Sequence, residues 1–170
     1  LNLFAYTGAA SLAAKCAGAD VTHLDSIKQV ITWANKNMEI SNIKDIRWIV
    51  EDALKFVKRE AKRGNRYQGI IMDPPAYGHG PGGERWKLDD LLYEFILELS
   101  AILEPKNSFL LLNLYSNGYS PLLSDTLVRA AFGVKDAQTA KEIQTECGEL
   151  YLKDQFEKAL PLSVFTRLRR

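Results

Sequence analysis

Apolar and polar positions follow two alternating periods along the chain, and each period predicts a type of secondary structure. Short apolar runs predict strands over 1–6, 20–25, 46–50, 67–73 and 108–115. Apolar residues at helical spacing predict helices over 9–18, 27–38, 53–63, 88–103 and 120–132. Strands that alternate with helices in this way predict a parallel sheet with helices on both faces, the doubly wound, Rossmann-like α/β fold.

The pattern changes after residue 132. Residues 133–147 are polar and predict a loop with some helix, whereas 148–153 and 160–168 predict two strands with a short connection. We expect these two strands to form an antiparallel hairpin that closes the sheet, so that residues 1–170 make one domain. Because the chain opens directly in a strand-like run with no methionine, we also expect it to be a fragment whose natural N-terminal part is missing.

Charge and composition narrow the class of partner. Hydrophobic residues make up 46% of the chain, and 22 basic residues against 21 acidic ones give a net charge of +1. A nucleic-acid partner would therefore depend on local basic clusters, of which the sequence has two, at 55–66 and 165–170. The first cluster is more readily explained as the solvated face of a helix.

The cysteines and the lengths of the apolar runs indicate the cellular compartment of the protein. No apolar run approaches the roughly 20 residues of a membrane-spanning helix, and no signal peptide is visible. Cys16 and Cys147 have no spacing typical of a metal site. We therefore expect a reduced, cytoplasmic protein without a metal or a membrane partner, in which both thiols are small core residues.

Three successive predicted strands end in residues suited to a nucleoside. Gly8 follows the first strand and allows a sharp turn close to a ligand. Asp25 ends the second, where a carboxylate can accept both ribose hydroxyls, and Asp52 follows the third, where it can accept from an adenine amino group. Each has an ordinary alternative, a turn for Gly8 and helix caps for the aspartates. The GxGxxG of a dinucleotide site is absent, which disfavours a nicotinamide-dependent oxidoreductase.

The segment "IIMDPPAYGHGPGGERW", residues 70–86, carries the candidate chemistry. Asp73 ends the fourth strand and would project toward the cofactor, and Pro74 and Pro75 fix the backbone so that their carbonyls can accept from an incoming amino group. Tyr77 offers an aromatic face on which a flipped base can stack. An ordinary loop with a packing tyrosine is the alternative.

The glycine-rich residues that follow predict a mobile flap over the substrate. Arg85 and His79 are candidate phosphate or base contacts, although an exposed loop histidine is more often incidental. Trp86 is a candidate for stacking on a base, and anchoring of the loop to the core is its alternative role.

These segments together resemble a known family. "NLFAYTGAASLAAK", "VTHLD", "DPPAYGHGP" and the closing "ALPLSVFTRLR" are similar to class I S-adenosylmethionine-dependent ribosomal RNA methyltransferases, in particular the bacterial family that modifies large-subunit cytosines and guanines. The resemblance implies a sheet of strand order 3-2-1-4-5-7-6 in which only strand seven is antiparallel. It also implies S-adenosylmethionine as the cofactor, RNA as the substrate, and an N-terminal RNA-binding domain that is absent here.

The same resemblance assigns roles to the residues at the strand ends. Tyr6, Thr7 and Gly8 would flank the methionine part of the cofactor, Asp25 would bind the ribose, and Asp52 with Ala53 would bind the adenine. We expect the remaining cofactor contacts from Phe4, Ser26 and Asp73.

The sequence departs from the family where carbon 5 of cytosine is methylated. That reaction needs a nucleophilic cysteine after strand five, and here Ser116 or Asn117 stands at that place. Direct transfer to a base nitrogen needs no nucleophile, and Asn117, with Asn113, could orient the acceptor, although Asn117 and Gly118 are also an ordinary turn pair. Cytosine C5 transfer, a protein or small-molecule substrate, and a non-catalytic RNA-binding module are the alternatives.

Overall fold

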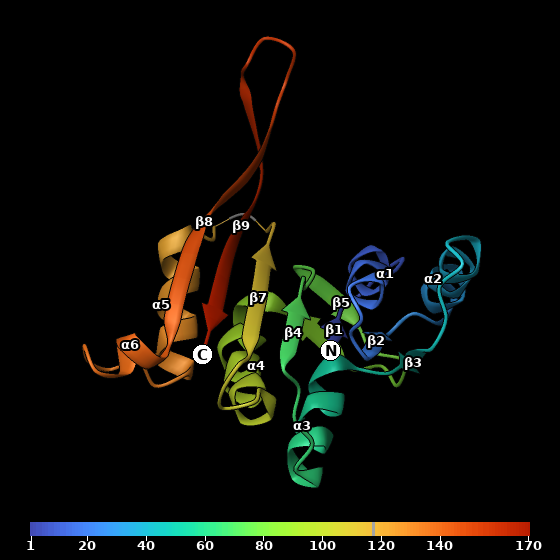
Figure 1. Cartoon of the computed structure of the whole chain (residues 1–170), viewed down its shortest axis with the longest axis horizontal. Coiled ribbons are helices and arrows are strands. Elements are labelled where there is room, and N and C mark those ends of the chain that lie inside the picture. The colour runs from blue at the N-terminus through green and yellow to red at the C-terminus, as the bar shows by residue number, and fades with distance from the viewer. Residues whose placement is uncertain (117) are drawn as a thin grey trace.

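The protein is described here by a computed structural model that covers residues 1–116 and 118–170, and within those residues seven strands form one sheet (Figure 1). The sheet order is β3-β2-β1-β4-β7-β9-β8. Its strands are β1 (Asn2–Leu3), β2 (Val21–Asp25), β3 (Ile46–Val50), β4 (Gly69–Met72), β7 (Phe109–Leu114), β8 (Gln144–Lys153) and β9 (Ala159–Arg169). Within this described sheet, β9 alone runs antiparallel to its neighbours. The expected strand order is therefore confirmed.

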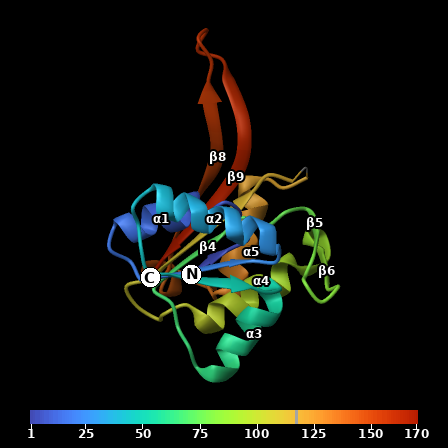
Figure 2. The same ribbon diagram turned by 90° about the vertical axis from the view of Figure 1, so that its right-hand side faces the viewer.

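Helices cover the sheet from both sides (Figure 2). On one face, α1 (Ala9–Cys16) and α2 (Lys28–Ile40) pack over β2 and β3. On the other face lie α3 (Ala53–Arg63), α4 (Leu88–Ile102) and α5 (Pro121–Ala131), which pack against one another in that order. Because β1 to β4 and β7 run parallel, their carboxyl ends meet at one edge of the sheet.

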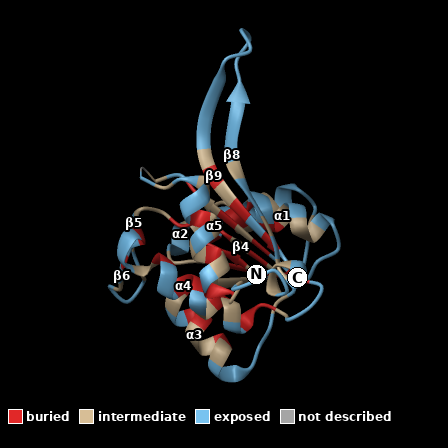
Figure 3. Cartoon of the chain, turned by 90° about the vertical axis from the view of Figure 1, so that its left-hand side faces the viewer, coloured by how far each residue is buried: buried red, intermediate tan, exposed pale blue. Residues whose placement is uncertain are grey.

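The main core lies between the sheet and α3, α4 and α5. Strand β7 shows how it is built, since Leu110, Leu112 and Leu114 are buried there while Leu111 and Asn113 on the opposite face are partly exposed. The burial pattern in Figure 3 shows the same division, with buried residues concentrated in the centre of the sheet. Helix α4 fills the core with Phe95, Ile96 and Leu99, among others.

The first strand is shorter than predicted. Strand β1 ends at Leu3 because Phe4 and Tyr6 have left-handed backbones, with φ of 55° and 47°, which turn the chain out of the sheet. Ala5 still donates from its backbone N–H to the carbonyl of Leu24, 3.0 Å away. The apolar run continues past the strand because these residues line the space beyond its end.

The glycine-rich residues after β4 form a second, two-stranded sheet rather than an irregular flap. Strands β5 (Tyr77–His79) and β6 (Arg85–Lys87) pair antiparallel, with Tyr77 opposite Lys87. The connecting turn closes through the N–H of Gly80 on the carbonyl of Glu84, at 2.8 Å. The hairpin is therefore defined by backbone hydrogen bonds, and its glycines serve the turn.

The closing hairpin is longer than predicted. Strand β8 begins four residues before its predicted run and ends where predicted, and β9 extends one residue past its run at each end. A short helix, α6 (Thr139–Glu142), precedes them. Figure 1 shows the far half of this hairpin extending well away from the body of the molecule. Residues 144–146 are polar because they lie at the edge of the sheet, so no apolar alternation marks them as strand.

The two cysteines are exposed, contrary to the expectation that both are core residues. Cys16 ends α1 and Cys147 lies on the edge strand β8. Among the residues that the structure describes, no helix combines the length and the apolar character needed to cross a membrane.

Candidate active site

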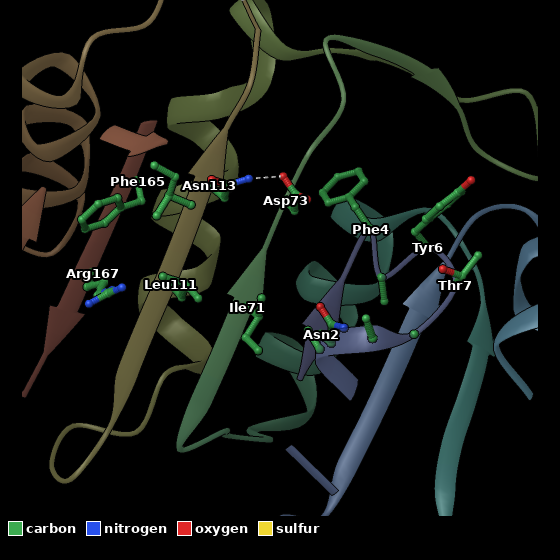
Figure 4. Close-up of a pocket in the computed structure, with 15 residues that line it drawn as sticks. Asn2, Phe4, Tyr6, Thr7, Ile71, Asp73, Leu111, Asn113, Phe165 and Arg167 are labelled. Atoms are coloured by element: carbon green, nitrogen blue, oxygen red, sulfur yellow. Dashed lines mark hydrogen bonds between the residues drawn. The ribbon is translucent and has the colours of Figure 1, made fainter. Parts of the chain in front are cut away.

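A pocket of about 360 Å³ opens at the carboxyl ends of β1, β4 and β7 (Figure 4). Its lining comes from β1 and the loop after it, from β4 and β7, and from Leu150, Phe165 and Arg167 of the β8–β9 hairpin. The lining includes Phe4, Ala5, Tyr6, Thr7, Gly8, Ile71, Asp73, Leu111 and Asn113. Five residues predicted to bind the cofactor therefore face one cavity: Phe4, Tyr6, Thr7, Gly8 and Asp73.

The loop after β1 is held in an unusual backbone conformation. Gly8 has a φ of 92°, and a Cβ there would lie 3.2 Å from the Cβ of Ala34 on α2, so both the angle and the space favour glycine. Asn37, also on α2, donates from Nδ2 to the carbonyl of Thr7 at 3.0 Å. Together with the left-handed Phe4 and Tyr6, this loop stores backbone strain beside the pocket, which is common at binding sites.

Asp25 fixes the same loop from the end of β2. Its Oδ2 accepts from the backbone N–H of Tyr6 and its Oδ1 from that of Ile27, each at 3.0 Å. The helix-cap role considered as the alternative for this aspartate is not present in that form, because Ile27 is the N-cap residue of α2, but the carboxylate does fix the turn that leads into the helix. Each carboxylate oxygen has more than one acceptor position, so Asp25 can still accept from a ribose hydroxyl. The ribose role stays a prediction.

A second, smaller cavity lies next to the pocket and shares Phe4 with it. Its lining brings together Asp25, Ser26, Asp52, Ala53, Pro75, His79 and Trp86. Asp52 also caps α3, because its Oδ1 accepts from the N–H of Lys55 at 2.9 Å. The residues assigned to ribose and adenine are therefore neighbours, although contact with a nucleoside stays a prediction for each.

Asp73 stands at the mouth of the main pocket in a chain of hydrogen bonds across three strands. Asn113 on β7 donates from Nδ2 to Oδ1 of Asp73 at 2.8 Å, and Ser163 on β9 donates to Oδ1 of Asn113 at 2.7 Å. Partial burial of the carboxyl group raises the pKa of Asp73 above its usual value. The hydrogen bond from Asn113 acts in the opposite direction and reduces this rise. Asn113 therefore fixes both the orientation and the charge of this carboxylate.

The diproline carbonyls are not both free, which corrects the sequence interpretation. The indole Nε1 of Trp86 donates to the carbonyl of Pro75 at 2.7 Å. Trp86 itself is 5% exposed and packs against Phe4 with ring centroids 4.9 Å apart. It therefore anchors the β5–β6 hairpin to the core, and stacking of this indole on a substrate base, as predicted, does not fit its burial. The acceptor role of the Pro74 carbonyl stays a prediction.

The outward face of the β5–β6 hairpin carries the other predicted substrate contacts. Tyr77 is 68% exposed, and the strand register puts it opposite Lys87 and puts His79 opposite Arg85. Side chains opposite each other in an antiparallel pair share a face, so these four lie together on the side away from Trp86. Asn117, also predicted to contact substrate, lies outside the described residues.

The hairpin is attached to α3 by an ion pair between Lys55 and Glu84. Other basic residues of the 55–66 cluster are also paired, Lys58 with Glu94 and Arg59 with Glu51. With Arg63, which pairs with Glu60, four of the six basic side chains of this cluster meet a carboxylate, which fits its interpretation as a face of α3.

Two residues of the site, Tyr115 and Ser163, were not predicted from the sequence. Tyr115, after β7, lines a cavity with Ala76, Tyr77 and Asp89, and burial together with the charge of Asp73 raises its pKa. Ser163 acts on Asp73 through Asn113 from 50 positions further along the chain. Neither belongs to a motif, and only the antiparallel register of β7 and β9 could have paired Asn113 with its surroundings.

No cluster of three or more metal-ligating side chains occurs in the described parts of the chain.

The sheet order, the strained loop after β1 and the acidic end of β4 together define the class I methyltransferase fold. No family model matches the chain. It is 31% identical over 117 residues to the ribosomal RNA large subunit methyltransferase K/L of Shewanella frigidimarina, a match that covers 66% of this chain and 16% of that protein.

Solved structures agree with the fold. The S-adenosylmethionine-dependent methyltransferase from Agrobacterium tumefaciens is 38% identical, with a TM-score of 0.89 over 99% of this chain and 54% of its own. A protein described as a methyltransferase and crystallised with S-adenosylhomocysteine is 21% identical, with a TM-score of 0.77 over 98% of this chain and 44% of its own. The chain thus spans about half or less of these proteins. The predicted resemblance to S-adenosylmethionine-dependent and large-subunit ribosomal RNA methyltransferases is confirmed.

Proposed function

We propose that residues 1–170 are the catalytic domain of an S-adenosylmethionine-dependent methyltransferase that acts on RNA, with ribosomal RNA as substrate and a base nitrogen as acceptor. One observation carries this most directly, the Asn113-held carboxylate of Asp73 between the strained loop after β1 and the Pro74–Tyr77 segment. The names of the Shewanella and Agrobacterium relatives support the reaction class and, for the former, the substrate.

The side chains at the pocket fit the proposed cofactor. S-adenosylmethionine carries an adenosine, a sulfonium and an amino acid without phosphates, which suits a site that lacks a phosphate-binding glycine loop. Asp25, Ser26 and Asp52 line the cavity on the nucleoside side, and Tyr6, Thr7 and Gly8 line the pocket on the amino-acid side. Bound there, the cofactor would supply an electrophilic methyl group.

The chain would then act by orienting the acceptor. Because Oδ1 of Asp73 is occupied by Asn113, Oδ2 is the atom that would accept a hydrogen bond from the acceptor's N–H, with the carbonyl of Pro74 as a second acceptor. Tyr77 would stack on the base, an interaction worth about 1–3 kcal/mol per base. Holding the nitrogen lone pair in line with the methyl is the main contribution expected of such a site.

Transfer to nitrogen is favoured over cytosine C5 because the pocket lacks an activated nucleophile. Among the described residues, Ser116 Oγ has no hydrogen-bond partner, so no neighbouring base activates it. Cys147 lies on the edge strand β8 and lines none of the cavities described above.

An RNA substrate would meet the outward face of the β5–β6 hairpin, where Tyr77 lies among His79, Arg85 and Lys87. This face is small, and most of the cluster on α3 is paired with carboxylates, so we infer that a further RNA-binding domain contributes most of the affinity. Modification of ribosomal RNA would place the protein in the cytoplasm.

Calorimetric titration with S-adenosylmethionine, S-adenosylhomocysteine and NAD tests the cofactor. We expect micromolar binding of the first two and none of NAD, whereas binding of NAD alone would mean an oxidoreductase. Transfer of a labelled methyl group to undermodified ribosomal RNA, followed by mass spectrometry of the nucleosides, tests the substrate and atom. Binding of S-adenosylmethionine without methyl transfer to RNA, in this chain and in a longer form, would contradict the proposed substrate. Transfer of the label to a protein or a small molecule would then identify the substrate class instead.

A further inference from the structure

The outer half of the β8–β9 hairpin has the features of an interaction surface. We call residues 149–162 the arm; in Figure 3 it is exposed along its length. Six large apolar side chains of the arm are between 40% and 70% exposed: Leu150, Tyr151, Leu152, Phe156, Leu160 and Leu162. Together they present about 600 Å² of largely apolar surface, divided between the two faces of the arm because Leu152 lies opposite Leu160 and Tyr151 opposite Pro161. This total is at the upper end of the range for the largest patch on a monomer.

Strand β8 is also an open edge. It is last in the sheet order, so within the described chain its outer side has no strand partner over Gln144–Lys153. The register of the hairpin shifts between Leu150 and Tyr151, and the extra residue, Leu162, lies on β9. Consecutive residues of β8 are therefore all paired. Natural edges of this length are usually blocked by proline, bulges or repeated charges. Strand β8 has no proline, the register shift places the extra residue on β9, and the charges on β8 are of both signs, Glu146, Glu149 and Lys153.

The sequence at this edge is complementary to itself. In an antiparallel pair of two copies with Tyr151 on the two-fold axis, the stretch Glu149–Lys153 reads E-L-Y-L-K against K-L-Y-L-E. Each Glu149 then lies opposite Lys153 of the second copy, each Leu150 opposite Leu152, and the two tyrosines meet. Because alternate residues share a face, the charged pairs flank the tyrosines on one face and the leucines lie on the other.

We propose that β8 pairs with β8 of a second copy of this chain across a two-fold axis at Tyr151, to form an isologous dimer with a continuous sheet. Three acidic and two basic residues lie between 148 and 162, so the arm does not have the positive charge that a nucleic-acid partner requires. Edge-to-edge pairing covers only part of the apolar area of the arm, less than the ~800 Å² per partner of a standard interface, so the backbone hydrogen bonds between the two β8 strands and the side-chain pairs across them carry the contact.

Charge reversal tests the register directly. By symmetry, Glu149→Lys converts both cross-strand ion pairs into Lys–Lys pairs, and Lys153→Glu converts both into Glu–Glu pairs. We expect each single variant to dissociate about tenfold or more readily. The double variant E149K/K153E restores opposite charges, and so does an equimolar mixture of the two single variants. Lys158→Glu is the matched control, because it changes the same charge on the arm away from the edge.

Sedimentation velocity over a range of concentrations gives the result. We expect the natural chain, the control, the double variant and the mixture to reach twice the 19.1 kDa monomer mass, and the single variants to remain monomeric at concentrations where the others dimerise. Lys153 also contacts Glu157 at 2.5 Å within the arm, so circular dichroism is used to confirm that each variant is folded. A natural chain that stays monomeric, or a dimer indifferent to both reversals, would overturn the proposal.

Discussion

Asn113 joins β7 to β4 through the 2.8 Å hydrogen bond from its Nδ2 to Oδ1 of Asp73, and its own carbonyl is fixed by Ser163. Asp73 thus sits at the mouth of the pocket with one oxygen occupied and the other available (Figure 4). The orientation of the proposed acceptor site therefore depends on a residue 40 positions away that no motif marks.

Removal of this amide should lower methyl transfer and change its pH dependence. Burial raises the pKa of Asp73 and the Asn113 hydrogen bond lowers it, so in Asn113→Ala the raising effect is unopposed. The acidic limb of the pH–rate profile should therefore move to higher pH, and the rate at neutral pH should fall about tenfold, the scale of one hydrogen bond to a charged group. Ser163→Ala removes only the hydrogen bond to Oδ1 of Asn113, so it should shift the acidic limb less. An unchanged acidic limb in Asn113→Ala would mean that Asp73 does not need to be ionised.

Asp25 should affect both cofactor affinity and the loop after β1. Asp25→Ala removes the acceptor for the N–H groups of Tyr6 and Ile27 as well as the proposed ribose acceptor. We expect cofactor binding to weaken by about 1–3 kcal/mol and the melting temperature to fall. Titration calorimetry and thermal denaturation separate the two effects. A variant that loses stability but binds the cofactor with full affinity would restrict Asp25 to its structural role.

Tyr77 should matter for transfer and hardly at all for folding. Its side chain is 68% exposed, so Tyr77→Ala should leave the melting temperature and the cofactor affinity close to those of the natural chain. The rate of methyl transfer should fall about 5- to 150-fold if about 1–3 kcal/mol of stacking is lost. Tyr77→Phe keeps the aromatic face and should retain most of the rate. A sharp loss of stability in Tyr77→Ala would instead identify a packing residue.

Trp86 should behave in the opposite way. It is buried against Phe4 and its indole satisfies the carbonyl of Pro75, so Trp86→Ala leaves both a cavity and an unpaired acceptor. We expect a loss of about 3–5 kcal/mol in the free energy of unfolding. Denaturant titration measures it. Near-normal stability with reduced RNA binding would restore the base-stacking role predicted from the sequence.

The sequence predicted the sheet well because its inner strands read as apolar runs, although one face of β4 and of β7 is only partly buried. The bounds of α3 are the same in prediction and structure, since Asp52 caps its start and Gly64 its end. The edge was predicted less well. Residues 144–147 pair as strand without an apolar pattern, because they belong to the edge strand and pair on one side only, with β9.

The candidate site shows a similar division. Residues next to strand ends, such as Asp73 and Gly8, could be located because strand ends in this fold have a known position. Their state could not, since it depends on contacts between distant segments. The occupied carbonyl of Pro75 and the burial of Trp86 both follow from how the β5–β6 hairpin folds back, which a glycine-rich sequence does not specify.

His23 should make stability fall in mild acid. Its imidazole is fully buried on β2, and Nδ1 is hydrogen-bonded to Ser11, itself bonded to Asn2. Burial lowers the pKa of His23 to about 4 from 6.5, against a smaller raising effect of the backbone of Tyr6. Between these values the unfolded chain binds a proton that the folded chain does not, so the free energy of unfolding should decrease as pH falls from 6.5 to 4.

The loss from this one residue should total roughly 3 kcal/mol. Carboxylates also titrate near the lower end of this range, so the measurement needs a variant without the imidazole. In His23→Gln, urea denaturation at several pH values should show a shallower decline between pH 6.5 and 4 than in the natural chain, whatever the change in absolute stability. Equal slopes in the two proteins would mean that His23 is protonated in the folded state and that the buried Asn2–Ser11–His23 network carries a charge.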